Sequence, residues 1–195
     1  MRKPRFPPMV TDIIQTALVA CEGIVFSDRP ACPLCGGAVR RYDTRKKQFA
    51  VILEEDGKRN IYVRVQRFTC KSCGMLCNAD EPFYPDTRVG SPVIDLCVTF
   101  AGTIPFTRTA THLSCLGIAI DRGSVRNYAQ RAWGPIPAAD MFGMRLPFSI
   151  LTLSSLAASA GEGGGIRGAE VLAACNFPSA HRAALHRLPA REERE

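Results

Sequence analysis

The spacing of apolar and polar residues changes along the chain, and each pattern predicts a different kind of element. Residues 48–54 and 60–68 alternate with a period of two and are rich in β-branched and aromatic residues, which is typical of strands. They flank Glu55-Asp56-Gly57-Lys58, whose Asp-Gly pair favours a tight hairpin turn. The pattern predicts an antiparallel hairpin in the first half of the chain.

Before this hairpin, apolar residues recur at helical spacing. Thr11 is placed to cap a helix that continues to Ala20 or Glu22, and Gly23 follows its end. We expect this helix to pack against the hairpin. The basic, proline-rich residues 1–10 are expected to form a loose arm.

After the hairpin, three helices are expected between residues 91 and 133. The first covers residues 92–102 and the second residues 105–117, each with a proline at its start and a glycine at its end. Asp121 is a good N-cap for the third. Three helices with a glycine-led turn before the last form a trihelical helix-turn-helix pattern. The apolar stripe of the third helix consists of Val125, Tyr128, Ala129, Ala132 and Trp133.

The last third of the chain is predicted to be helical. Residues 141–160 are expected to contain a buried helix, because their uninterrupted apolar part, residues 148–160, is too short for a bilayer that needs about 20 residues. The glycine-rich residues 161–165 form a hinge, and helical spacing returns over residues 167–188. That last stretch has two interpretations, a second helix-turn-helix and a plain core hairpin.

Together these patterns predict an α+β fold, with a small antiparallel β unit followed by a trihelical helix-turn-helix and a helical C-terminal segment. The expected divisions are a basic arm with the first helix (1–30), the β unit (31–90), the helix-turn-helix (91–134) and the helical C-terminal region (135–195).

Two cysteine pairs bracket the hairpin. Cys32-Pro-Leu-Cys35-Gly and Cys70-Lys-Ser-Cys73-Gly are separated by 34 residues, and each pair is followed by a glycine that suits a metal-binding knuckle. Four thiolates at this spacing predict one tetrahedral Zn²⁺ in a zinc ribbon. Because four thiolates leave no open coordination position, we expect the zinc to be structural and not catalytic.

The remaining cysteines change this interpretation little. The odd total of nine and the metal spacing of four favour a reducing cytoplasm over a disulfide-bonded secreted scaffold. Cys77 is a spare candidate ligand. The other thiols lie in apolar helical contexts and are expected to be small core residues: Cys21, Cys97, Cys115 and Cys175.

The charge balance points to a polyanionic partner. The chain carries 25 lysines and arginines against 18 acids, a formal net charge of +7. With the helix-turn-helix pattern, this charge leads us to expect double-stranded DNA as the partner, with a nucleoid location when bound and with neither a membrane nor a small-molecule substrate. A second copy of the chain, in a homodimer, is an additional candidate partner.

The expected DNA contacts fall into two sets. Arg126 and Asn127, in the first turns of the third helix, are best placed to reach base edges. The full set on that helix is Arg122, Ser124, Arg126, Asn127, Gln130 and Arg131. The set on the ribbon, expected to add affinity through phosphates, is Arg40, Arg41, Lys46 and Lys47, with Arg45, Arg64, Arg67 and Lys71 in the same basic group.

The order of these motifs resembles the N-terminal DNA-binding region of insertion-sequence transposases. The resemblance rests on CPLCG, on RFTCKSCG with Arg67-Phe68 leading into the second pair, on Leu96-Cys-Val-Thr-Phe-Ala-Gly, and on residues 109–126 with Ser124-Val-Arg-Asn. It covers residues 31–133 and implies binding of DNA through a zinc ribbon and a helix-turn-helix. In that family a separate catalytic domain uses three carboxylates with a divalent metal.

The chain departs from that family after Trp133. The few acids there do not lie in β-branched runs that could hold a metal-binding aspartate, which argues against a nuclease centre of its own. Two other functions are open: a zinc-ribbon adaptor that binds protein, and an RNA-binding ribbon whose aromatic residues stack on bases, namely Phe49, Tyr62 and Phe68.

Overall fold

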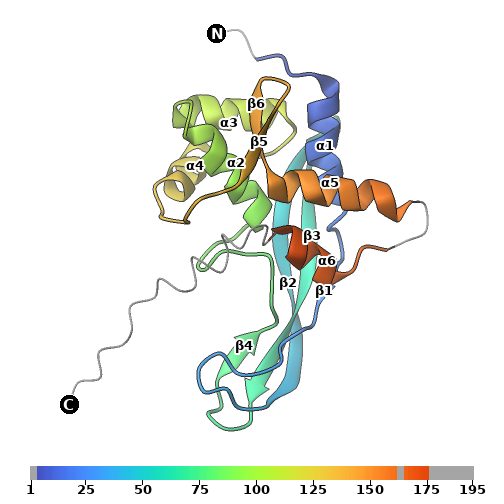
Figure 1. Ribbon diagram of the computed structural model, residues 1–195, viewed down its shortest axis with the longest axis vertical. Coiled ribbons are helices and arrows are strands. Elements are labelled where there is room, and N and C mark those ends of the chain that lie inside the picture. Colours follow the sequence, from blue (N-terminus) through green and yellow to red (C-terminus); the bar gives the residue numbers. More distant parts are fainter. Residues whose placement is uncertain (1–3, 162–164, 176–195) are drawn as a thin grey trace, which may run out of the picture.

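A long antiparallel hairpin runs through the centre of the fold (Figure 1). In the computed structural model, which describes residues 4–161 and 165–175, β2 (Val39–Glu54) and β3 (Gly57–Cys70) pair from Glu54 opposite Gly57 at the tip to Val39 opposite Cys70 at the open end. The predicted hairpin is confirmed. Both strands are longer than predicted, because β2 extends through the basic residues 40–47, where no apolar alternation marks a strand.

Two short strands complete this sheet on β3. β1 (Val25–Phe26) runs parallel to the middle of β3, and β4 (Leu76–Asn78) runs antiparallel to its last residues. The open end of the hairpin and β4 lie at one end of the molecule, away from the helices at the other end (Figure 1). The fold is therefore mixed α+β, as predicted.

Three helices pack beside the hairpin. α1 (Pro8–Val19) begins three residues before the predicted cap Thr11, since a proline in its first turn replaces a side-chain cap. It contacts β2, as expected, but packs more extensively on α5 (Phe148–Ala160). α6 (Gly168–Cys175) contacts α5 and β1. Within the described residues, no helix combines the length and apolar character needed to cross a membrane.

The three helices expected between residues 91 and 133 are present. α2 (Ser91–Ala101), α3 (Phe106–Cys115) and α4 (Arg122–Ala129) pack against one another. Asp121 caps α4, because its carboxylate accepts a hydrogen bond of 2.9 Å from the backbone N–H of Ser124. α4 ends before the last two residues of the predicted stripe. Of those two, Trp133 is still buried, and its ring N–H donates to the Tyr128 carbonyl.

A second hairpin replaces the first part of the predicted C-terminal helical region. β5 (Ala138–Met141) and β6 (Met144–Pro147) pair through a turn in which Phe142 and Gly143 both have positive φ. The helix expected within residues 141–160 is therefore limited to α5, and it begins directly after Pro147. Most of the second candidate helix-turn-helix, residues 167–188, lies outside the described residues.

The turn between α3 and α4 is joined to the hairpin by backbone hydrogen bonds. Leu53 N–H donates to the Gly117 carbonyl at 2.8 Å, and Ala119 N–H donates to the Val51 carbonyl at 2.9 Å. Gly117 has φ +81°, and a Cβ there would lie 2.0 Å from the Gln15 amide nitrogen of α1. A side chain at Gly117 would therefore strain the turn and push the Gln15 side chain aside.

The apolar core lies between the inner face of the hairpin and helices α1, α2 and α5. Alternate residues of β3, Ile61, Val63 and Val65, are fully buried there, which confirms the period-two pattern. The largest fully buried side chains of this core are Phe26, Phe49, Ile14, Leu18, Ile52, Ile61, Ile94, Leu96, Leu113, Leu116, Ile118 and Leu146.

A buried carboxylate ties several of these elements together. Asp95 of α2 is only 4% exposed, and it accepts hydrogen bonds from the Tyr84 hydroxyl at 2.7 Å and from the Ser149 hydroxyl of α5 at 2.6 Å. The Tyr84 ring in turn contacts the Trp133 ring, 4.5 Å between centroids. Burial raises the pKa of Asp95 from 3.8 to about 6, although both hydroxyls lower it.

This burial predicts a pH-dependent stability. A folded-state pKa above the unfolded value means that the folded protein holds the proton more tightly, so its free energy of unfolding falls as pH rises from about 4 to about 6. Asp95→Asn, which keeps the shape and stays neutral, should remove this fall. At pH 8 it should stabilise the protein by about 3 kcal/mol over wild type, measured by urea denaturation across pH.

The exposed strand residue Asp140 provides the control. Asp140→Asn removes one carboxylate at the surface and should leave the wild-type pH dependence in place. Loss of metal at low pH would affect all three proteins alike, so the differences between them are the quantity to compare. Parallel wild-type and Asp95→Asn profiles between pH 4 and 8 would contradict the assignment.

Candidate metal centre and basic surfaces

The two cysteine pairs form knuckles with the same backbone structure. In the first, Cys32 N–H donates to the Gly37 carbonyl and Gly36 N–H donates to the Cys32 carbonyl, both at 3.0 Å. In the second, Cys70 N–H donates to the Met75 carbonyl at 2.8 Å and Gly74 N–H to the Cys70 carbonyl at 3.1 Å. The glycines after the pairs adopt φ of +70° and +73°, which explains why glycine follows each second cysteine.

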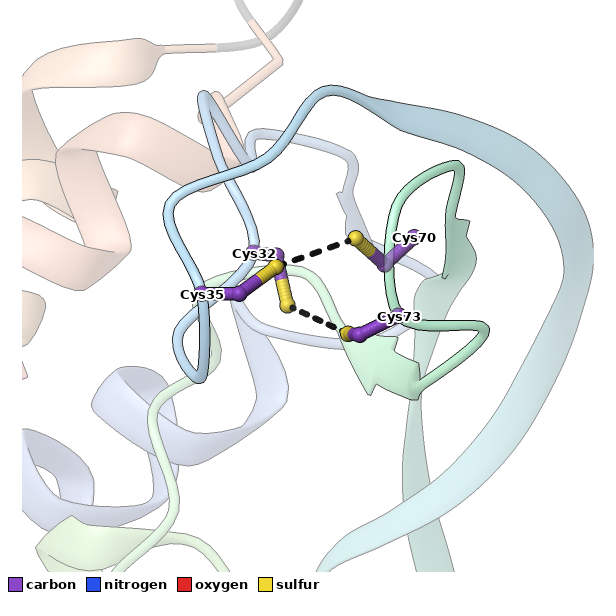
Figure 2. Close-up of side chains that lie close together, drawn as sticks. All are labelled: Cys32, Cys35, Cys70 and Cys73. Atoms are coloured by element: carbon purple, nitrogen blue, oxygen red, sulfur yellow. Dashed lines mark hydrogen bonds between the residues drawn. The ribbon is translucent and has the colours of Figure 1, made fainter.

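The hairpin brings both knuckles to its open end, where their thiols face one another (Figure 2). The four sulfur atoms lie within 4.8 Å of one another, with Cys32 to Cys73 at 3.7 Å and Cys35 to Cys70 at 3.5 Å. A tetrahedral ion with bonds of about 2.3 Å to sulfur places its ligands about 3.8 Å apart. The four thiols are therefore placed to hold one metal ion.

Backbone N–H groups of the knuckles favour the thiolate form at the first cysteine of each pair. The N–H groups of Cys73 and Ser72 lower the pKa of Cys70 to about 6, and those of Cys35 and Leu34 lower the pKa of Cys32. Thiolate is the form that binds a metal, so these contacts favour the metal-binding form of Cys32 and Cys70, whereas the neighbouring thiols raise the pKa of Cys35 and Cys73. The two knuckles also touch closely, since a Cβ on Gly37 would lie 2.5 Å from the Ser72 hydroxyl.

The spare candidate Cys77 does not belong to this cluster. It lies on β4 and is 7% exposed, and burial raises its pKa. Cys21, Cys97 and Cys175 are buried in the apolar core, as expected, whereas Cys115 at the end of α3 is only half-buried.

The outward face of α4 carries most of the residues expected to bind DNA. Arg122, Arg126 and Asn127 are exposed on α4, and Gln130 and Arg131 are exposed just after it. Arg131 is partly engaged, because it donates to the Asp86 carbonyl at 3.4 Å and lies over the Trp133 ring.

Ser124 has a different environment from the rest of this set. It is half-buried, and its hydroxyl donates to the Asp121 carboxylate at 2.6 Å. That contact and the N–H contact hold the pKa of Asp121 below its usual range. Ser124 thus completes the cap of α4.

The basic residues of β2 divide into exposed and paired ones. Arg40, Arg41, Arg45 and Lys46 are exposed, and the Lys46 ammonium lies 3.9 Å from the centre of the Tyr62 ring. Lys47 is half-buried and forms an ion pair of 2.7 Å with Glu81. Its charge is largely neutralised within the fold, as is that of Arg67, which pairs with Asp43.

The aromatic residues expected to stack on RNA bases are not available as a set. Phe49 is fully buried and Phe68 is 6% exposed, so both belong to the core. Only Tyr62 reaches the surface, where Lys46 covers its ring.

Some residues that shape these surfaces escaped the sequence analysis. The sequence carries one signal of the Asp95 network, because Asp95 is a lone acid within the apolar run Val93–Cys97, which indicates a buried carboxylate. Arg29 also went unnoticed, although it fixes the segment before the first knuckle by bonding the Asn78 carbonyl and pairing with Asp80, both at 2.8 Å. No local pattern marks that contact.

No protein-family model matches the chain, and searches of curated proteins and of solved structures find no match either. The site is thus interpreted from its geometry alone.

The metal site makes a direct prediction. Cys35→Ser should weaken metal binding by at least about 100-fold. Changing a residue that only hydrogen-bonds a metal ligand already lowers metal affinity by up to about 100-fold, and Cys35 would be a ligand itself. Because metal binding and folding are coupled, hydrogen exchange should become fast in residues 32–37 and 69–76 while α2 stays protected. Metal content and competition with a chromophoric chelator measure the first effect, and exchange mass spectrometry measures the second.

Cys115→Ser is the matched control, since this thiol lies outside the cluster. It should retain one metal ion per chain and the wild-type exchange pattern. Equal metal affinity in wild type and Cys35→Ser would show that the four thiols do not form the site.

Proposed function

We propose that this chain is a zinc-dependent protein that binds double-stranded DNA through α4. The observation that carries the proposal is the outward face of α4, where cationic and amide side chains are exposed and the carboxylate of Asp121 is occupied by the cap. Arginine and asparagine side chains have the donor geometry to bind guanine and adenine edges in the major groove. Arg126 and Asn127 lie in the first two turns, the part of a recognition helix that enters the groove.

Zinc is the metal that the ligand set supports best. Four thiolates at tetrahedral spacing suit Zn²⁺, and a site closed by protein ligands is structural. We therefore assign a binding role and no catalytic role. The resemblance to transposase DNA-binding regions and a cytoplasmic, nucleoid-associated location belong to the same proposal.

Within this function, exposed cations of the hairpin add affinity that is independent of sequence. Arg40, Arg41 and Lys46 are free to meet phosphates, whereas Lys47 is held by Glu81. Self-association is compatible with this arrangement, and sedimentation of the free protein and of the DNA complex would measure it.

A protein-binding adaptor is the second candidate. The knuckle end exposes apolar side chains, with Leu34 66%, Leu76 43% and Met75 38% exposed. Exposed apolar residues of this kind are suited to a protein partner. Such binding would depend only weakly on salt, unlike binding to DNA.

The first test is binding of the zinc-loaded protein to a fluorescent mixed-sequence duplex across a salt titration. Phosphate contacts from Arg122 and Arg131, beside the base-reading Arg126, predict a slope of log K against log salt of about −2 or steeper. The expected dissociation constant at low salt is micromolar or tighter. Absence of binding at about 50 mM salt, with the metal present, would favour the adaptor.

The second test addresses base recognition. On a duplex obtained by binding-site selection, Arg126→Ala should cost about 1–3 kcal/mol and relax the preference at one base pair. Arg126→Lys keeps the charge but loses the bidentate geometry, so it should preserve the salt slope and still lose the base preference. Electrophoretic mobility shift on the selected and base-substituted duplexes measures both effects. Unchanged affinity and preference in Arg126→Ala would remove Arg126 from the reading surface.

A further inference from the structure

An open hollow of about 620 Å³ separates the hairpin tip from the start of α4. Its walls come from three parts of the chain that are far apart in sequence. The polar residues that line it include Gln48, Lys58, Asn60, Arg88, Asp121 and Ser124.

One wall is fixed to α4 by the backbone. The two hydrogen bonds from β2 to the α3–α4 turn hold Leu53 against Gly117. Lys58 lies directly opposite Leu53 in the β2–β3 ladder. The hairpin therefore holds Lys58 beside the turn that leads into α4.

The other wall is the loop before α2, and it is also held against α4. The Arg131 guanidinium donates to the Asp86 carbonyl, and the Tyr84 ring contacts Trp133. Arg88 follows in the same loop and lines the hollow together with Tyr128 of α4. Arg88 and Lys58 therefore both border the hollow at which α4 begins.

The charges in this hollow leave a net positive surface. Lys58 and Arg88 are both exposed, and neither forms an ion pair with any acid in the described part of the chain. The one acid among the lining residues is Asp121, and both of its carboxylate oxygens accept hydrogen bonds from Ser124. An anion is the ligand that this arrangement favours.

We propose that Lys58 and Arg88 clamp backbone phosphates of the duplex next to the bases that α4 reads. This inference rests on the proposed function and deepens it, because it adds phosphate contacts that no motif marks. Phosphate contacts fix the register and orientation of a protein on DNA, whereas base contacts provide sequence preference. Because both cations line the hollow at the start of α4, their phosphate contacts set how that helix enters the groove.

The test compares the salt dependence of duplex binding in charge-removing and charge-preserving variants. Lys58→Ala and Arg88→Ala should each reduce the magnitude of the salt slope by about 1, and the double variant should reduce it by about 2. Affinity at about 100 mM salt should fall by about the same factor on every duplex sequence, because phosphates carry no sequence information. Lys58→Arg and Arg88→Lys should keep the wild-type slope. Fluorescence anisotropy over a salt series measures all of these.

Arg167→Ala is the matched control for loss of one positive charge. Arg167 lies on the segment leading into α6, beside β1, and its side chain is 80% exposed. Its removal should leave the slope unchanged. Thermal unfolding checks that every variant has the wild-type fold, which is expected for exposed side chains.

A second readout locates the contacts on the DNA. Replacing single phosphates by neutral methylphosphonates should identify positions at which wild type loses affinity and the double variant does not. Duplex binding by wild type with an unchanged slope in the double variant would overturn the clamp and leave the proposed function standing. Failure of wild type to bind any duplex would overturn both.

Discussion

The register of the β2–β3 hairpin is the constraint on which the rest of the structure depends. At one end it places Cys70 opposite Val39, so that the two knuckles meet and their thiols converge. At the other end, Val51 and Leu53 of β2 form backbone hydrogen bonds with the α3–α4 turn. A shift of one residue would turn every side chain of a strand to the opposite face and would separate both contacts.

The two ends of this hairpin are stabilised by different means. Near the tip, β2 and β3 bury apolar residues against α1, α2 and α5. Towards the open end, residues 40–46 are exposed on both faces of the strand, so little apolar surface is buried there. Instead of a core, that end has the four thiols that are placed to hold one metal ion, whose binding would supply the stabilisation that so little buried apolar surface cannot.

Local signals account for what could be predicted from the sequence. Three of these signals lie within a few residues of the structure they determine, and each is found where it was expected. They are the two cysteines within each knuckle, the Asp56-Gly57 turn and the cap at Asp121. The β5–β6 hairpin was missed because its turn, Phe142-Gly143, lacks the Asn-Gly or Asp-Gly pair that marks such turns.

Tertiary contacts account for what could not be predicted. The ion pair of Lys47 with Glu81 and the approach of Lys58 and Arg88 to α4 depend on which distant segments meet. Periodicity assigns a residue to a face of its own element, but it does not identify the residue across from it. For this reason five of the six candidate DNA residues on the α4 face were found exposed as expected, while Ser124 and Lys47 turned out to be engaged within the fold.

The placement of the knuckles at the open end of the hairpin has a consequence for the order of folding. Contacts at the tip join residues close in sequence, whereas the thiol cluster joins positions 35 to 41 residues apart. Closing a short loop costs less chain entropy than closing a long one, so strand pairing is expected to begin at Asp56-Gly57 and to proceed toward the cysteines. The four thiols then meet only when the last strand pairs form, so a metal ion bound there would stabilise a hairpin whose strands are already paired.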